Sequence, residues 1–138
     1  MNTNYVAVLV AAVAQFIFGA IWYMPLFGKL WGKIHGFDQV DPAKQKEMMK
    51  DMVPMLVVQF IGTVVTTKVL AIMMNVVSSD YSPYKLAVLL WLGFMVPTQI
   101  AAVIFGGTKP GWVMKKIFIM IGASLGCMLI AAFVLKSF

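Results

Sequence analysis

Arginine is absent from this chain, and cysteine and histidine each occur only once. Without a guanidinium fork to read guanine or clamp phosphate, the net charge of +6 does not indicate nucleic-acid binding. The single Cys127 excludes a paired-thiol relay. The single His35 excludes bis-histidine haem ligation and a zinc site, so we interpret it as an interfacial polar residue. We expect no enzymatic activity, no cofactor and no metal site.

Charged residues are also scarce, and the hydrophobic residues that take their place indicate the class of protein. Only 12% of residues are charged and 62% are hydrophobic, whereas a soluble domain carries about 25% charged residues. Four apolar runs cover roughly 4–27, 53–74, 84–105 and 111–135. Each has about the 20 residues that a helix needs to cross a bilayer, and a spanning backbone must bond to itself. The sequence predicts an all-α integral membrane four-helix bundle of two hairpins, forming a single transmembrane domain over 1–138.

The lysines are unevenly distributed between the connections. Eight lie in the first and third connections and the start of the fourth run, against two, Lys85 and Lys136, on the opposite side. The eight are Lys29, Lys33, Lys44, Lys46, Lys50, Lys109, Lys115 and Lys116. The positive-inside rule then predicts a multi-pass protein of the cytoplasmic membrane with both termini outside. Aromatic residues fit this layout, with Trp22, Tyr23, Trp31 and Trp112 expected at the inner interface.

The first connection is expected to contain a short cytoplasmic amphipathic helix over about 42–51. Asp41 can cap its free amides, and Pro42 suits its first turn. Four methionines follow at helical spacing, and they fit apolar contact with the membrane surface better than a site for soft metal ions. They are Met48, Met49, Met52 and Met55. The acidic residues are interpreted as solvated surface, and they are Asp38, Asp41, Glu47 and Asp51.

One segment at the end of the first run is distinctive. The residues Trp22-Tyr23-Met24-Pro25-Leu26-Phe27-Gly28, followed by a short charged helix and a second span rich in small residues, resemble a bacterial membrane family catalogued as domain of unknown function 1761. The later turn Phe105-Gly106-Gly107-Thr108 agrees with this resemblance. The resemblance implies four spans in a bacterial cytoplasmic membrane. It implies no known activity, so no catalytic residue is carried over.

Polar and small side chains share helix faces in the first two runs. Gln59, Thr63 and Thr66 are spaced i, i+4 and i+7 in the second run. Gln15 and Gly19 lie on a similar stripe of the first run. Membrane helices use such faces because the backbones can approach closely and the side chains can bond across the interface. We interpret them as contact residues, with a solute pathway as the alternative.

The other two runs carry related features. Gly122 and Gly126 are spaced as a small-residue contact face that needs a close partner helix. In the third run, Pro97 lies four residues after Gly93 and removes the amide that would bond its carbonyl. A hinge is therefore expected at Gly93 and Pro97, with Gln99 near the exposed acceptor.

Lys68 is the only charged residue deep inside a run, away from the run ends. Helical side chains lean toward their own N-terminus, which directs Lys68 back into the membrane. Its candidate partners are Asp80, the Gly93 carbonyl, Gln99, or a neighbouring subunit or ligand. Snorkelling to the nearer surface is an equally open alternative.

Two functional classes remain open. The first is a non-enzymatic bundle that acts through helix contacts, as a homo-oligomer or an accessory subunit of a membrane complex. The alternative is a small oligomeric transporter or channel for an anionic or neutral solute. Exporters of cationic drugs need an intramembrane carboxylate, which no run contains. The segment 106–111 lacks the full phosphate-binding motif and the strand before it, so we interpret it as a tight turn. The expected partners are the lipid bilayer and other helices, with no nucleic acid.

Overall fold

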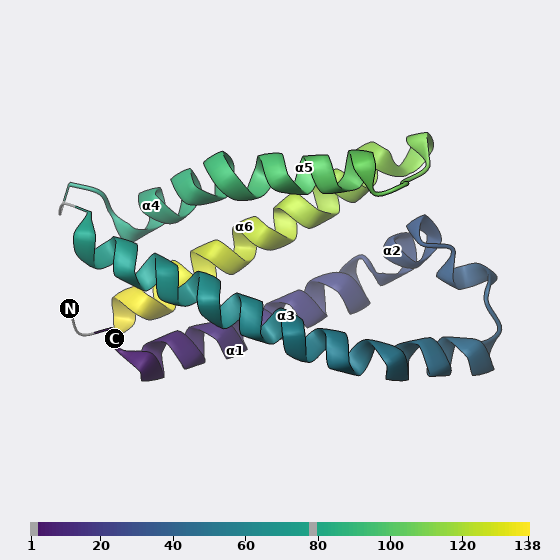
Figure 1. Cartoon of the computed structure of the whole chain (residues 1–138), viewed down its shortest axis with the longest axis horizontal. Coiled ribbons are helices and arrows are strands. Elements are labelled where there is room, and N and C mark those ends of the chain that lie inside the picture. The colour runs from purple at the N-terminus through teal and green to yellow at the C-terminus, as the bar shows by residue number, and fades with distance from the viewer. Residues whose placement is uncertain (1–2, 78–79) are drawn as a thin grey trace.

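The computed structural model describes residues 3–77 and 80–138. Within them, four helical stretches are long and apolar enough to cross a membrane: Tyr5–Leu26, Pro42–Val76, Pro83–Phe105 and Pro110–Ser137. Figure 1 shows successive spans running in opposite directions along the long axis of the molecule, so that α1 begins and α6 ends on the same side. We call that side the termini end, and the side formed by residues 27–41 and 106–112 the basic end. The predicted all-α membrane architecture is confirmed.

The first span ends in a widened turn and is followed by a short helix. Helix α1 covers Tyr5–Ile21, and the Asn4 side chain caps it by accepting from the Ala7 amide at 3.2 Å. A π-helical turn, η1 (Trp22–Leu26), contains Pro25 and completes the span. Helix α2 (Gly28–Ile34) and the 3-10 turn η2 (Phe37–Gln39) then form the connection. The sequence did not predict α2, because its two glycines weaken the helical pattern.

The second span is longer than predicted. Helix α3 runs from Pro42 to Val76 without interruption, passing through Pro54. Residues 42–51 are helical, as predicted, but they are the first turns of α3 and do not form a separate helix. The side chain of Asp41 makes no capping hydrogen bond. At about 1.5 Å per residue, the 35 residues of α3 extend about 52 Å, so the helix projects beyond a ~30 Å hydrocarbon core.

The third span also contains a π-helical turn. Helix α4 (Pro83–Leu90) leads into η3 (Trp91–Met95), and α5 (Val96–Phe105) completes the span. The turn includes Gly93 and lies just before Pro97, where the extra residue in the turn accommodates the lost backbone bond. After a short connection, η4 (Pro110–Trp112) begins the last span and α6 covers Val113–Ser137.

Helix α6 is the centre of the bundle. It packs against α1 on one side and against α4 and α5 on the other, and α3 also contacts it. Many fully buried residues are alanines, which let the helices approach closely: Ala7, Ala11, Ala12, Ala87, Ala123, Ala131 and Ala132. The largest buried cluster lies toward the termini end, around Leu70, Leu86 and Met128.

The basic half of α3 stands apart from this core. Every residue from Lys46 to Gln59 is exposed. Figure 1 shows the corresponding part of α3 diverging from α5 and α6 toward the basic end. This stretch therefore offers all its faces to lipid or to another helix.

Candidate functional site

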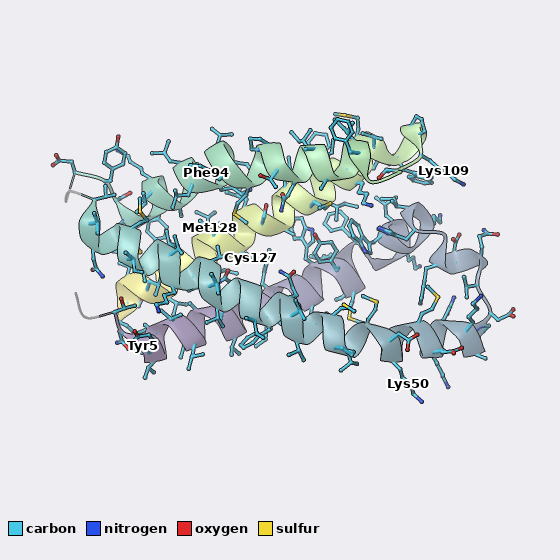
Figure 2. All side chains as sticks on the ribbon, viewed as in Figure 1. Tyr5, Lys50, Phe94, Lys109, Cys127 and Met128 are labelled. Atoms are coloured by element: carbon cyan, nitrogen blue, oxygen red, sulfur yellow. The ribbon has the colours of Figure 1, made fainter. Side chains whose placement is uncertain are left out.

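A buried amide joins α1 to α3. Gln15 is 4% exposed, and its Nε2 donates to the Thr67 hydroxyl at 2.7 Å and to the Ala11 carbonyl at 3.1 Å. The Thr67 hydroxyl donates in turn to the Thr63 carbonyl at 2.7 Å. From α6, the Cys127 thiol lies 3.8 Å from the Gln15 carbonyl. Figure 2 places Cys127 near the middle of the bundle, so three helices meet at this contact. Gln15 is thus a residue of the packed interior.

A second polar contact joins α6 to the third span. The Trp91 indole donates to the Ile121 carbonyl at 3.1 Å and to the Ser124 hydroxyl at 3.0 Å. The Ser124 hydroxyl lies 3.0 Å from Gln99 Oε1 and 3.1 Å from the Ile121 carbonyl, and its single proton serves one acceptor at a time. Gln99 is therefore engaged with α6.

Trp22 makes the matching contact from the first span. Its indole donates to the Ile119 carbonyl at 3.0 Å. Trp22 and Trp91 each begin a π-helical turn, so the two widened turns both place an indole against the backbone of α6. Sequence reasoning expected Trp22 at the membrane interface and did not select Trp91. The sequence feature that could have identified both residues is that each tryptophan precedes a proline within the same span.

The glycine face of α6 is filled within the chain. A Cβ added to Gly122 would lie 2.8 Å from the Trp22 ring, and one added to Gly126 would overlap the Phe18 ring. The partner helix that this face was expected to need is therefore α1 of the same chain. Gly19 has no such contact, since an added Cβ would meet nothing within 4 Å.

The predicted polar stripe of α3 faces outward. Gln59 and Thr66 are exposed, and Gly62 has open space where a Cβ would lie. The hydroxyls of Thr63 and Thr66 each donate to a carbonyl one turn earlier, at 3.0 Å. The stripe therefore lines no path through the interior of this chain. Lipid is as apolar as a protein core, so spacing did not show which face is buried. The residue that faces inward is Thr67, which sequence reasoning did not select.

Lys68 reaches the termini end. Its side chain is exposed, and its Nζ lies 5.5 Å from the centroid of the Tyr5 ring. Tyr5 begins α1, and Figure 2 shows it at the opposite end from Lys109. Of the two alternatives left open by the sequence, this contact agrees with snorkelling toward the nearer end, because the four-carbon stem of Lys68 is long enough to overcome the lean of the Cα–Cβ bond. This contact is a cation–π interaction, an arrangement worth about 0.5–2 kcal/mol.

The predicted hinge coincides with a local feature of the third span. Gly93 is exposed within η3, and Pro97 is the second residue of α5. The Thr98 hydroxyl donates to the Phe94 carbonyl at 2.5 Å. Phe94 projects outward from the bundle in Figure 2, and its side chain is 71% exposed. The widened turn thus presents an aromatic side chain to the surroundings.

Comparisons with known proteins identify a family for this chain. A family model described as "Protein of unknown function (DUF1761)" matches residues 6–136. No curated protein and no solved structure matches the chain. Four long apolar helices make this a multi-pass membrane protein. Because the family model covers nearly the whole chain, the protein belongs to the DUF1761 family.

Proposed function

We propose that this protein is a non-enzymatic component of the bacterial cytoplasmic membrane that acts by self-association through the outward stripe of α3. We define that stripe as Gln59, Gly62, Thr63 and Thr66. The observation that carries the proposal is Gln59, whose side-chain amide is exposed on an apolar helix and has no hydrogen-bond partner in residues 3–77 and 80–138.

The depth of Gln59 in the membrane makes that amide costly. It lies six residues beyond Val53, where the apolar part of α3 begins, or about 9 Å along the helix. An amide moved from water into hydrocarbon without a partner costs roughly 4–8 kcal/mol. Pairing with another helix recovers part of this cost, and interhelical hydrogen bonds in membranes contribute about 0.6–1.7 kcal/mol each.

A second copy of the chain supplies a fitting partner. A glutamine amide carries both donors and an acceptor, so two Gln59 side chains related by a two-fold axis can bond to each other. Gly62, one turn away, leaves space for close backbone approach. The hydroxyls of Thr63 and Thr66 already donate hydrogen bonds within α3. These side chains can therefore pack at the interface without a further hydrogen-bond partner.

The orientation belongs to the same proposal. The basic end faces the cytoplasm and both termini face outward, because eight lysines lie in or next to the basic connections and two lie on the other side. Figure 2 shows Lys50 and Lys109 both toward the basic end, at opposite edges of the molecule.

The transporter alternative has less support. Lys68 was the main candidate for contact with a transported solute, but it lies at the surface beside Tyr5. The buried polar residues Gln15, Thr67 and Ser124 all have hydrogen-bond partners within the chain. These contacts close the interior between helices and leave no unpaired polar group among the three to receive a solute.

The test compares three leucine substitutions on α3. Gly62→Leu and Gln59→Leu alter the stripe, while Val57→Leu changes an exposed residue about 160° around the helix from Gln59. The mass of each purified protein in nanodiscs is measured by light scattering. We expect the wild type and Val57→Leu to form the same oligomer, and both stripe variants to be monomeric.

Two outcomes would contradict the proposal. One is a wild-type protein that stays monomeric at every protein-to-lipid ratio and co-purifies with no partner. The other is a Gly62→Leu protein that retains the wild-type mass. A different membrane protein that co-purifies with the wild type and is lost from both stripe variants would replace self-association by the accessory-subunit role.

A further inference from the structure

The basic end contains a cavity that the proposed association does not use. It has a volume of about 680 Å³ and lies between two connections far apart in the sequence. One wall comes from the end of α2 and from η2, and the other from the turn after α5 and the start of the last span. The residues that matter to its chemistry are Lys33, Asp38, Thr108, Lys109, Trp112 and Lys116. Figure 2 shows Lys109 in the turn at this end of the molecule.

The charge of the cavity is positive. Three lysines line it against one carboxylate, that of Asp38. Within the described ranges 3–77 and 80–138, none of these three ammonium groups has a carboxylate within ion-pair distance. Asp38 Oδ2 lies 3.5 Å from Gln39 Nε2. The three lysines carry like charges that repel one another, so an anion bound in the cavity that they line lowers the electrostatic energy.

Lys116 forms a contact between the two walls of the cavity. It is half-buried on α6, and its Nζ lies 5.7 Å from the centroid of the Trp31 ring on α2. The neighbouring Lys115 behaves differently, because its Nζ lies 4.9 Å from the Trp112 ring and it does not line the cavity. The two adjacent lysines therefore provide a matched pair for experiment.

A second, independent observation concerns Thr108. Its hydroxyl oxygen is fully buried and has no hydrogen-bond partner among the described residues. Leaving a buried hydroxyl without a partner is unfavourable, so a ligand in the cavity gains by bonding to it once the side chain or the turn shifts to expose the oxygen. Gly107, the residue before it, has φ +75°, a conformation that holds the turn in place and that other residues rarely adopt.

We propose that this cavity binds a phosphate group, carried either by an anionic phospholipid at the membrane surface or by a phosphate free in solution. Basic pockets between spans at the cytoplasmic face suit such headgroups, and the Trp112 ring lining the cavity is typical of the lipid headgroup level. The site rests on residues from two connections and not on a phosphate-binding motif, which segment 106–111 lacks. Lysine provides point charges here, since the chain contains no arginine.

The experiment uses the full-length protein in mild detergent. Native mass spectrometry measures the binding of phosphatidylglycerol, with phosphatidylcholine as the uncharged comparison, and a thermal shift with inorganic phosphate tests the free ion. One lysine near a membrane surface contributes about 1 kcal/mol, so Lys116→Gln should weaken binding about fivefold. Lys115→Gln removes the same charge and should leave binding unchanged.

The two sources give different results. Binding of phosphatidylglycerol that depends on Lys116, without a response to inorganic phosphate, assigns a lipid headgroup. A response to inorganic phosphate with the same dependence assigns a free phosphate. The proposal is overturned if neither probe binds, if phosphatidylcholine binds equally well, or if Lys115→Gln and Lys116→Gln weaken binding equally.

Two further variants act without removing a lysine. Asp38→Asn removes the one carboxylate of the cavity and should tighten phosphate binding severalfold. Thr108→Val keeps the side-chain shape and removes the hydroxyl, so it should weaken binding while raising thermal stability. A Thr108→Val protein that binds phosphate as well as the wild type would show that Thr108 does not contribute to the site. An Asp38→Asn protein that binds phosphate more weakly would contradict the proposal.

Discussion

Replacing Gly126 by alanine should destabilise the fold, although alanine is the better helix former. The added Cβ would overlap the Phe18 ring, and the backbones of α1 and α6 would have to separate or the ring would have to move. Overpacking of this kind costs about 1–3 kcal/mol. The gain in helix propensity is about 1 kcal/mol, so the net loss is about 0–2 kcal/mol.

A matched control isolates the overlap. Gly19→Ala makes the same chemical change in α1, where a Cβ would meet nothing within 4 Å. The propensity gain is common to both variants and cancels in their difference. We therefore expect Gly126→Ala to be less stable than Gly19→Ala by about 1–3 kcal/mol.

The assay is reversible unfolding in mixed micelles with increasing dodecyl sulfate. It is followed by the fluorescence of the tryptophans, including Trp22, whose ring contacts the same face of α6. A second variant tests the mechanism: Phe18→Leu should make Gly126→Ala less costly than it is in the wild type, because the smaller side chain leaves room. Equal stability of Gly126→Ala and Gly19→Ala, within about 0.5 kcal/mol, would refute the packing account, since that difference is below the overpacking range.

Three further changes test other contacts. Trp22→Phe removes the indole that donates to the Ile119 carbonyl and should cost about 1 kcal/mol in the same unfolding assay, whereas Trp112→Phe should cost less; equal losses would contradict a specific role for the Trp22 bond. Lys68→Met gives up the contact with Tyr5 but also an exposed charge, so its stability should stay within about 1 kcal/mol of the wild type; a loss above 3 kcal/mol would mean that Lys68 has a stronger partner. A cysteine at Lys44 should be labelled only from the cytoplasm and one at Tyr81 only from the periplasm, and the reverse pattern would invert the proposed orientation.

The four spans could be predicted because their cause is local. A bilayer requires about 20 apolar residues per crossing, and that requirement is visible in composition alone. The boundary between the connection helix and the second span was not predictable in the same way. The charged residues before the apolar run that begins at Val53 suggested a separate helix, yet α3 continues through Pro54, which removes only one backbone bond.

Helix faces were harder to assign than helices. In a soluble protein, polarity separates the buried face from the exposed one, but lipid and core are equally apolar. The sequence therefore identified Gln15 as a contact residue but selected Thr63 and Thr66 on the outward side of α3, where the inward residue is Thr67. Gly126 was recognised as a close-contact position, but nothing local indicated that Phe18 of the same chain fills it.

The sequence by itself determined the class of protein, the number and approximate limits of the spans, and the concentration of lysine in two connections. Those properties follow from the composition of each segment and from the solvent that it must meet. The tertiary structure alone decided which faces are buried, that α6 is central, that Trp22 and Trp91 both bond to its backbone, and that the two basic connections line one open cavity. These properties depend on contacts between segments far apart in the chain, and such contacts are set by how side chains fit together.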